Sequence, residues 1–548
     1  MKNSFWTLLV TGLLLLTGAG CGRETDDGRA QGRTAAPAVA ATPAGAVRLR
    51  LVAGSENREL EPLIQEFARR QGMAIEVVYM GSIEIGRELA KGKDCPFDAV
   101  WPAASLWIDM FDEAKVTRNA ESIMRTPVVF GVRKSVARSL GWVGADVRVM
   151  DILQAAEARK LRFAMTSASQ SNSGASAYLG FLSAFAGSPE VLRPEDLARE
   201  EVRTRTQRFL GQVDRSVGSS GFLKDLLLEK YDWLDAMVNY ESMVIAANQT
   251  LVARGREPLY VVYPVDGLTI ADSPLAVVAK GDVQKEAGVQ QLQRFLLSPE
   301  SQRRIQALGW RTGLVGPGAE AADIRVFNPD WGITPDKILA PIRLPAGPVI
   351  RAALDLYQGV FRKPCCTLFV LDFSGSMRGT GERQLKEAMR ILLTPALAQR
   401  YLLQPAPKDV TIVMPYSDDV VGEWKAEGND PQVLDGLLSQ IEAQNALAGT
   451  YTHKALLRAL RTAKTYAATG KYHTSIVLMS DGAATDSLAD FFRTVDDRGI
   501  GRDIPIYTIL FAEAKERDMK ALAEGMGGKM FDGRKDVAKA FREARGYN

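Results

Sequence analysis

The stretch Cys366-Thr-Leu-Phe-Val-Leu-Asp372-Phe-Ser-Gly-Ser376 joins a continuous apolar run to a loop that carries one carboxylate and two hydroxyls. An unbroken apolar run of this kind is typical of a strand at the centre of a parallel sheet, buried on both faces. Asp372, Ser374 and Ser376 follow at the strand's carboxyl end, the edge at which open α/β sheets bind ligands. Carboxylate and hydroxyl oxygens suit hard cations such as Mg²⁺ or Mn²⁺. The stretch therefore predicts an α/β domain with a metal site at the edge of its sheet.

The residues after this stretch continue with alternating helices and strands. A helix is predicted over 383–393, because its apolar residues fall on one helical face, at Leu385, Ala388, Met389 and Leu392. Further patterns predict a helix at 454–465 and strands at 410–415, 476–479 and 505–511. Strands that alternate with helices indicate parallel pairing in a doubly wound sheet. Residues 364–548 are therefore expected to form one α/β domain.

Two further loops of this domain carry oxygen-bearing side chains. Ala448-Gly449-Thr450 precedes the predicted helix at 454–465, and Ser480-Asp481-Gly482 follows the predicted strand at 476–479. Together with the Asp-x-Ser-x-Ser of 372–376, and in the same order along the chain, they resemble the metal-ion-dependent adhesion site of von Willebrand factor type A domains. The segment Gly527–Asp532 resembles the last strand of that family.

This resemblance implies a Rossmann-like fold with five metal ligands, namely Asp372, Ser374, Ser376, Thr450 and Asp481. It implies Mg²⁺, or Mn²⁺ or Ca²⁺, as the cofactor, and one position left open for an acidic residue of a protein partner. The alternative is a type A fold whose site holds no metal. A catalytic role for the same serines is disfavoured, since no histidine or lysine is placed to activate them.

An earlier alternation of strands and helices begins near Val47. Strands are predicted at 47–53, 74–79, 98–101, 127–132 and 161–165, with helices at 58–72 and 83–91, again indicating parallel pairing. Polar residues follow the first strands or precede an apolar helix, as Gly54-Ser55-Glu56-Asn57, Gly81-Ser82 and Ser169–Ser176. Hydroxyls and backbone amides at helix N-termini suit an anion or a polar small molecule. Helix capping alone explains any single one of these serines, but their repetition favours a binding cleft.

These features, with Asn239–Ser242 and Tyr263–Gly267, resemble bacterial extracellular solute-binding proteins of the type II periplasmic kind. The resemblance covers 47–345 and implies two α/β lobes around a cleft. The residues expected to line it are Ser55, Asn57, Ser82, Ser171, Ser173, Tyr240 and Asp266. The expected ligand is a small polar or anionic solute, either a tetrahedral oxyanion, an amino-acid-like molecule or another polar solute. A cleft that has lost its ligand and serves only as a scaffold is the remaining alternative.

The N-terminal residues are expected to form an export signal. Lys2 precedes an apolar run, Phe5–Leu16, which is too short to span a bilayer and fits a signal peptide. Gly18-Ala-Gly20 before Cys21 resembles the bacterial lipobox, which implies lipid modification of Cys21; ordinary secretory cleavage nearby is the alternative. The expected organisation is a signal peptide over 1–21, a disordered Pro/Ala-rich tether over 22–46, the two-lobed domain over 47–345, a linker helix over 346–363 and the type A domain over 364–548.

Composition narrows the function. A net charge of +3 over 548 residues gives no reason to expect a nucleic-acid partner. The chain has only two histidines, His453 and His473, which disfavours a histidine-dependent triad or an imidazole-rich zinc site, so no enzyme is expected. The sequence predicts an exported lipoprotein of the cell or outer membrane, facing the periplasm or the exterior, that combines metal-dependent protein contact with solute binding. The alternative is the substrate-binding lipoprotein of an ATP-driven importer, with the type A domain as an accessory.

Overall fold

The computed structural model describes residues 47–312, 323–334, 339–400, 403–447, 449–511, 516–534, 540–541 and 544. The predicted signal peptide, the tether and Cys21 lie outside these residues and stay predictions. Within the described part of the chain, no helix combines the length and the apolar character needed to cross a membrane.

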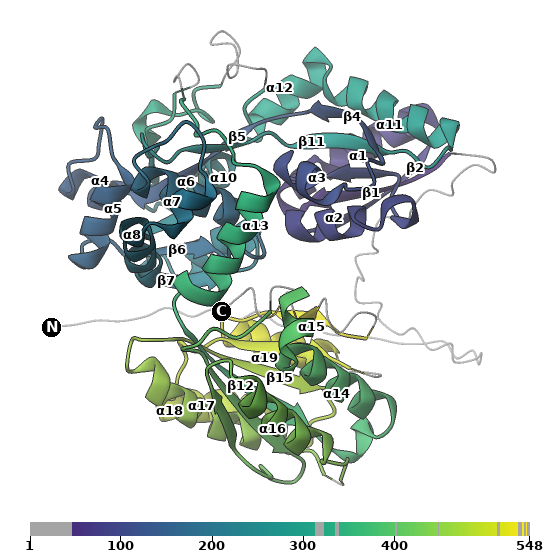
Figure 1. The fold of residues 1–548 in the computed structure, drawn as a ribbon, viewed down its shortest axis with the longest axis vertical. Coiled ribbons are helices and arrows are strands. Elements are labelled where there is room, and N and C mark those ends of the chain that lie inside the picture. Colours follow the sequence, from purple (N-terminus) through teal and green to yellow (C-terminus); the bar gives the residue numbers. More distant parts are fainter. Residues whose placement is uncertain are drawn as a thin grey trace, which may run out of the picture. The chain divides into compact units, whose positions relative to one another are not determined.

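The first sheet has five strands in the order β2-β1-β3-β11-β4. Figure 1 labels β1, β2, β4 and β11 of this sheet. Its strands are β1 Arg48–Gly54, β2 Ala74–Met80, β3 Ala99–Trp101, β4 Thr117–Ser122 and β11 Pro274–Val278. β1 pairs in parallel with β2 and β3, whereas β11 runs antiparallel to β3 and β4. Strand β11 was not predicted from the sequence, and it departs from the expected parallel pairing because it enters the sheet after the chain has passed through the second lobe.

Helices cover both faces of the first sheet. Successive residues of β1 point to opposite sides of the sheet, so its apolar side chains have to be buried on both faces. Leu51 packs with α1 and α11 on one face, and Val52 packs with α2 and α3 on the other. The helical segments of this lobe are η1 Ser55–Leu60, α1 Glu61–Gln71, α2 Ser82–Leu89, η2 Gly92–Asp94, α3 Leu106–Phe111, α11 Val283–Leu296 and α12 Pro299–Ala307. The predicted helix at 58–72 thus starts later as an α-helix, since the residues before Glu61 form the 3₁₀ turn η1.

The second sheet has six strands in the order β10-β5-β8-β6-β7, with β9 also pairing with β5. Its strands are β5 Thr126–Arg133, β6 Phe163–Thr166, β7 Val213–Val217, β8 Ala236–Tyr240, β9 Leu259–Val262 and β10 Thr269–Ala271. β6 is parallel to β7 and β8, whereas β5 is antiparallel to β8, β9 and β10. The predicted parallel pairing is therefore also wrong for β5, because the chain reaches this strand directly from the first lobe.

Helices of the second lobe follow most of these strands, as α4 Lys134–Ser139, α5 Val149–Glu157, α6 Asn172–Phe185, α7 Pro194–Ala198, α8 Glu200–Gly211, α9 Ser220–Glu229 and α10 Glu241–Ala253. The chain passes between the lobes at 123–125 and again at 272–273, where Ser122 Oγ donates to the Asp272 carbonyl at 2.6 Å. Two α/β lobes joined by adjacent crossing segments confirm the predicted two-lobed fold.

The predicted linker helix is present as α13 Gly347–Leu356, which continues as the π-helical turn η4 Tyr357–Phe361. α13 packs against α6, and the Tyr178 hydroxyl donates to the Ala353 carbonyl at 2.8 Å. A short 3₁₀ turn, η3 Pro329–Trp331, precedes it in the chain. The segment expected as a linker is therefore a packed helix.

The third sheet, in the C-terminal domain, has six strands in the order β14-β13-β12-β15-β16-β17, and every pair except β13–β14 is parallel. Its strands are β12 Cys365–Asp372, β13 Val410–Tyr416, β14 Trp424–Glu427, β15 His473–Ser480, β16 Ile506–Leu510 and β17 Met530–Asp532. Its helical segments are η5 Gly375–Met377, α14 Thr380–Leu393, α15 Pro395–Arg400, α16 Pro431–Glu442, α17 Thr452–Ala467, α18 Leu488–Asp497 and α19 Glu516–Gly525. The predicted doubly wound fold is confirmed.

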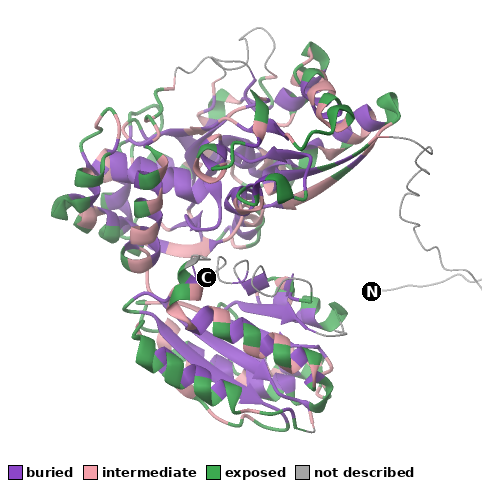
Figure 2. Ribbon diagram, turned by 45° about the vertical axis from the view of Figure 1, so that its right-hand side comes forward, coloured by how far each residue is buried: buried purple, intermediate pink, exposed green. Residues whose placement is uncertain are grey.

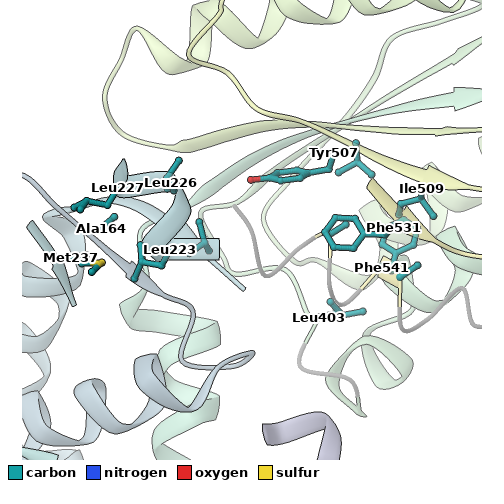
Figure 3. Packing of buried hydrophobic residues seen from close by; sticks show 14 of the residues in the cluster. Ala164, Leu223, Leu226, Leu227, Met237, Leu403, Tyr507, Ile509, Phe531 and Phe541 are labelled. Atoms are coloured by element: carbon teal, nitrogen blue, oxygen red, sulfur yellow. The ribbon is translucent and has the colours of Figure 1, made fainter. Parts of the chain in front are cut away.

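Strand β12 is buried along its whole length, as its apolar sequence predicts, whereas the helices around it alternate buried and exposed residues (Figure 2). Phe369 and Leu371 belong to a cluster with α14 and α16, while Leu368 and Val370 face α17 and α18. Figure 3 shows part of the first cluster, where Ile509 of β16 lies beside Phe531 of β17. Because helices cover both faces of the sheet, the ends of its strands are its accessible parts. Predicted metal ligands lie at the carboxyl ends of β12 and β15.

Candidate functional site

The predicted metal ligands come from neighbouring strands of the third sheet. Asp372 is the last residue of β12, and Ser374 and Ser376 follow it before α14 begins. Asp481 directly follows β15, which pairs in parallel with β12. Thr450 lies in the loop before α17, which packs against both strands. Parallel strands end at the same edge, so we expect the three segments, 372–376, the loop at Thr450 and the loop at Asp481, to meet there.

The carboxylate of Asp372 is held from two sides. Its Oδ1 accepts a hydrogen bond from the backbone N–H of Ser374 at 2.8 Å, and its Oδ2 accepts one from the Ser480 hydroxyl at 2.5 Å. The hydroxyl oxygens of Ser374 and Ser376 lie 3.1 Å apart. Ser374 is buried, whereas Ser376 is exposed. The loop thus brings a carboxylate and two hydroxyls together at the sheet edge, with Ser376 nearest to solvent.

The electrostatics of this edge favour a cation. Burial raises the pKa of Asp372 above its ordinary value, and the charge of Asp481 raises it further, while hydrogen bonds from Ser374 and Ser480 act in the opposite direction. A positive charge at this edge would offset the repulsion that Asp481 exerts on the Asp372 carboxylate. The pair is therefore suited to hold a divalent ion.

The loop that carries Thr450 depends on a glycine. Gly449 has a φ of +90°, and a Cβ at this position would lie 1.3 Å from Oδ1 of Asp418. The backbone carbonyl of Thr450 accepts hydrogen bonds from the N–H and the hydroxyl of Thr485 at 2.9 and 2.7 Å. The turn before α17 is thus fixed on both sides, which sets the position of Thr450.

Two residues of this edge were missed from the sequence. Tyr416 of β13 pairs with Asp372, and Ser480 of β15 directly follows Met479, which pairs with Leu371. The Tyr416 hydroxyl lies 3.0 Å from the Thr452 hydroxyl and interacts with Asp372 and Ser480. The strand register is the signal that would have revealed both residues, because it places the last residues of three parallel strands side by side.

The donor set fits a hard cation. The described residues contain no group of three or more histidine, cysteine, aspartate or glutamate side chains that could hold a metal. The proposed set instead combines two carboxylates with the hydroxyls of Ser374, Ser376 and Thr450, and such oxygens suit Mg²⁺ or Mn²⁺ rather than zinc.

In the two-lobed domain, hydroxyl groups form a buried cluster at the start of α6. The Ser173 hydroxyl lies 2.8 Å from those of Thr166 and Ser220, and the Ser171 hydroxyl lies 3.2 Å from that of Ser173. The structure thus brings Ser171 and Ser173 together. Ser220 starts α9 and was missed, because no sequence pattern places α6 beside α9.

A chain of hydrogen bonds joins the two lobes beside this cluster. Trp107 of the first lobe donates from Nε1 to Oδ1 of Asn172 at 2.7 Å, and Nδ2 of Asn172 donates to the Tyr240 hydroxyl at 2.9 Å. Burial, and then the charge of Glu56, raise the pKa of Tyr240 well above its ordinary value. The predicted site residue Tyr240 therefore lies where the lobes meet, with Glu56 of the first lobe nearby.

The other predicted cleft residues differ in their surroundings. Asn57 is fully buried, and neither of its side-chain polar atoms has a hydrogen-bond partner among the described residues. The Ser55 hydroxyl bonds to Glu56, and the Ser82 hydroxyl accepts from the Ala103 N–H at 2.9 Å. Asp266 instead accepts from the Val149 N–H at the start of α5, at 2.9 Å. The structure thus does not bring Asp266 together with the cluster around Ser173.

A buried ion pair stabilises the segment that links the lobes. Arg311 donates from Nε and Nη2 to the two carboxylate oxygens of Glu241 at 2.7 and 2.9 Å, and the Tyr263 hydroxyl donates to the same carboxylate. The backbones of Arg311 and Arg125 exchange hydrogen bonds of 2.9 and 2.7 Å, and Arg125 lies in the crossing segment. This pair was missed because its members are 70 residues apart.

Comparisons with known proteins match both parts of the chain. The family model for the bacterial extracellular solute-binding protein matches residues 49–311, and the model for the von Willebrand factor type A domain matches residues 367–483. A comparison with curated proteins found no match.

Solved structures similar to the chain include iron-bound HitA from Pseudomonas aeruginosa, with a TM-score of 0.42 and 15% identity over 57% of this chain and 98% of that one. The ferric binding protein from Campylobacter jejuni gives a TM-score of 0.41 and 14% identity over 56% and 98%. The sulfate-binding protein SubI from Mycobacterium tuberculosis H37Rv gives 0.37 and 18% over 55% and 94%. The assignment of the two parts rests on the family models: residues 49–311 form a bacterial extracellular solute-binding domain, and residues 367–483 form a von Willebrand factor type A domain.

Proposed function

We propose that this chain is an exported, membrane-tethered binding protein. Its type A domain binds a protein partner through a divalent cation, and its two-lobed domain binds a small polar or anionic solute. The arrangement of Asp372, Ser374 and Ser376 at the end of β12 carries the proposal, because it places a buried carboxylate and two adjoining hydroxyls at one sheet edge. The family model over 49–311 describes a solute-binding protein, which is consistent with the second part of this function.

The divalent cation is Mg²⁺, or Mn²⁺ or Ca²⁺, and its ligands are Asp372, Ser374, Ser376, Thr450 and Asp481. The bound cation supplies an attraction for a carboxylate, so an acidic residue of the partner completes its coordination. Ser480 positions Asp372 through its 2.5 Å hydrogen bond. Helix α14 packs against η5, which carries Ser376, and α17, which follows Thr450, packs against β12 and β15. The ligand side chains are therefore preorganised in the absence of the partner, which lowers the entropy cost of binding.

The polar groups where the lobes meet support the proposal that the two-lobed domain binds a solute. The N-termini of α6 and α9 lie at the hydroxyl cluster of Ser171, Ser173 and Ser220, and helix N-termini attract anions. Cys21 anchors the chain through a lipid, and residues 22–46 hold the folded domains away from the membrane. No nucleic acid is involved.

The experiment is cross-linked capture of envelope proteins by the mature chain, which begins at Cys21. Native protein is expected to capture a partner in Mg²⁺ and to lose it in EDTA. Ser376→Ala removes an exposed hydroxyl and should abolish that Mg²⁺-dependent capture, whereas Ser439→Ala, an exposed serine of α16, should retain it. Equal capture by the Ser376→Ala variant and the native chain would contradict the proposal.

The alternative is the solute receptor of an ATP-driven importer, with the type A domain as an accessory. The family match over 49–311 favours this candidate as far as solute binding is concerned. The two candidates differ in where affinity resides. A chain that binds a solute with micromolar affinity, but captures no protein through the type A domain, would establish the importer receptor instead.

A further inference from the structure

The second lobe and the type A domain are joined by a short packed segment. Phe361, the last residue of η4, packs against Tyr178 of α6, and β12 of the type A domain begins at Cys365. Strand β7 of the second lobe contacts β15 of the type A domain, and Arg215 of β7 donates from Nη2 to the Gly527 carbonyl at 3.0 Å. The start of the type A domain therefore lies beside β7.

A pocket of about 430 Å³ lies at this junction, a volume within the range of small-molecule sites, roughly 300–1,000 Å³. Strands β12 and β15 begin here, so the pocket is at the opposite edge of the third sheet from Asp372 and Asp481. Among the described residues, none from the first lobe lines it, so it is separate from the cleft between the lobes. Its lining includes Arg215, Trp233, Lys363, Tyr472, His473 and Thr474.

Polar donors in this pocket lack partners. Within the described chain, neither Arg215 nor Lys363 forms an ion pair with a carboxylate. Nε of Arg215 and the hydroxyl of Thr474 are buried without hydrogen-bond partners among the described residues. Buried polar groups are nearly always hydrogen-bonded, because an unpaired one costs free energy. A bound molecule that accepts hydrogen bonds would remove that cost.

The other charged groups of the lining leave the pocket positive. Lys230 and Arg502 are paired with Glu229 and Asp496, at 3.3 and 2.7 Å. Asp214 acts electrostatically on Lys363, but its Oδ2 is paired with Nε of Arg162 at 2.9 Å. Asp503 is then the one carboxylate of the described lining that could offset the charges of both Arg215 and Lys363. The pocket therefore favours an anion.

The imidazole of His473 responds to this charge. Burial lowers the pKa of His473 well below its ordinary value, and the charges of Lys363, Arg215 and Arg362 lower it further. Of these three cations, Arg362 is paired with Asp409. Burial also lowers the pKa of Lys363. A negatively charged ligand would act against the cations and raise the pKa of His473.

We infer that this junction pocket binds a small organic anion. Its charged group, a phosphate or a carboxylate, pairs with Arg215 and Lys363 and accepts from the Thr474 hydroxyl, while its apolar part packs against Trp233 and Tyr472. The Arg162 guanidinium lies 4.4 Å from the centroid of the Trp233 ring, and Trp233 is still 40% exposed, which leaves ring surface for a ligand. The site is additional to the proposed metal site and to the proposed solute cleft.

The experiment is a titration of the mature chain, labelled with ¹³C-histidine, with phenyl phosphate in buffer without divalent cations, followed by NMR. The chain has two histidines, so His473 reports on the pocket and His453 serves as an internal control. Phenyl phosphate is expected to shift the His473 imidazole resonance saturably and to raise its pKa by about one pH unit, leaving His453 unchanged. Phenol, which has the ring without the charge, should leave both resonances unchanged.

Two variants locate the contact. Arg215→Gln and Lys363→Met should each weaken the binding measured at His473 by at least about tenfold, since each removes a charge-assisted contact. The matched controls Arg493→Gln and Lys520→Met, whose side chains on α18 and α19 are 68% and 58% exposed, should bind like the native chain. Inorganic phosphate should bind about tenfold more weakly than phenyl phosphate, because it lacks the ring.

A His473 resonance that does not respond to phenyl phosphate would overturn the inference, as would native affinity in either Arg215→Gln or Lys363→Met. An equal response to phenol would overturn the assignment to an anion. Inorganic phosphate binding as tight as phenyl phosphate binding would overturn the assignment to an organic molecule. Each of these results would leave the proposed metal site and solute cleft in place, because neither contributes a residue to the pocket.

Discussion

Replacing Glu241 with glutamine should destabilise the two-lobed domain by about 3–5 kcal/mol, the usual cost of breaking a buried ion pair from one side. Glu241 is 0% and Arg311 is 4% exposed, so the guanidinium left behind has no access to water. Burial acts to lower the pKa of Arg311, but the charge and hydrogen bonds of Glu241 outweigh it and raise the pKa above its ordinary value. Glutamine keeps the shape of the side chain and removes the charge that offsets this burial.

The assay is urea unfolding of the mature chain followed by tryptophan fluorescence. Six of the eight tryptophans lie between residues 101 and 331, so the signal reports mainly on the two-lobed domain. The matched control is Glu190→Gln, which breaks an ion pair with Arg343 whose side chains are 79% and 72% exposed. This control should change the free energy of unfolding by less than about 1 kcal/mol.

The double variant Glu241→Gln/Arg311→Met removes both charges. It should be more stable than Glu241→Gln alone, since no buried charge is then left unpaired. Two results would refute this explanation. One is a loss of unfolding free energy in Glu241→Gln no larger than in Glu190→Gln. The other is a double variant that is less stable than Glu241→Gln by as much as an independent Arg311→Met substitution would cost.

Three further results are expected. Gly449→Ala should lower the stability of the type A domain by more than about 1 kcal/mol in calorimetry, because the φ of Gly449 is +90° and Asp418 occupies the position of the added Cβ. The control Gly436→Ala, on the open face of α16, should not lower it. Equal melting temperatures of the two variants would contradict this. Tyr416→Phe should weaken Mg²⁺ binding by about tenfold in calorimetric titration without changing the circular dichroism spectrum, and unaltered affinity would remove Tyr416 from the group that positions Asp372. Cys21→Ser should abolish metabolic labelling with palmitate, and continued labelling would rule out Cys21 as the lipidated residue.

Local sequence was sufficient for those parts of the site that neighbouring residues build. The apolar run that ends at Asp372 predicts a buried central strand, and the Asp-x-Ser-x-Ser spacing alone places Ser374 and Ser376 beside it. The loop expected to supply Thr450 likewise precedes a helix, α17, as predicted.

What sequence reasoning missed depends on pairing between distant segments. Ser480 and Tyr416 flank Asp372 only through the register of three strands, which no local pattern encodes. The antiparallel strand β11 was not predicted, and its partner β3 lies more than 170 residues earlier in the chain.

The central claim is that Asp372, Ser374, Ser376, Thr450 and Asp481 bind one divalent cation. Isothermal titration of the mature chain with Mg²⁺ and Mn²⁺ tests it most directly, using Asp372→Ala, the exposed-site variant Ser376→Ala and the control Ser439→Ala. We expect one saturable site in the native and control proteins, an affinity at least about tenfold weaker in Ser376→Ala and no site in Asp372→Ala. Equal heats from the native protein and from both site variants would contradict it.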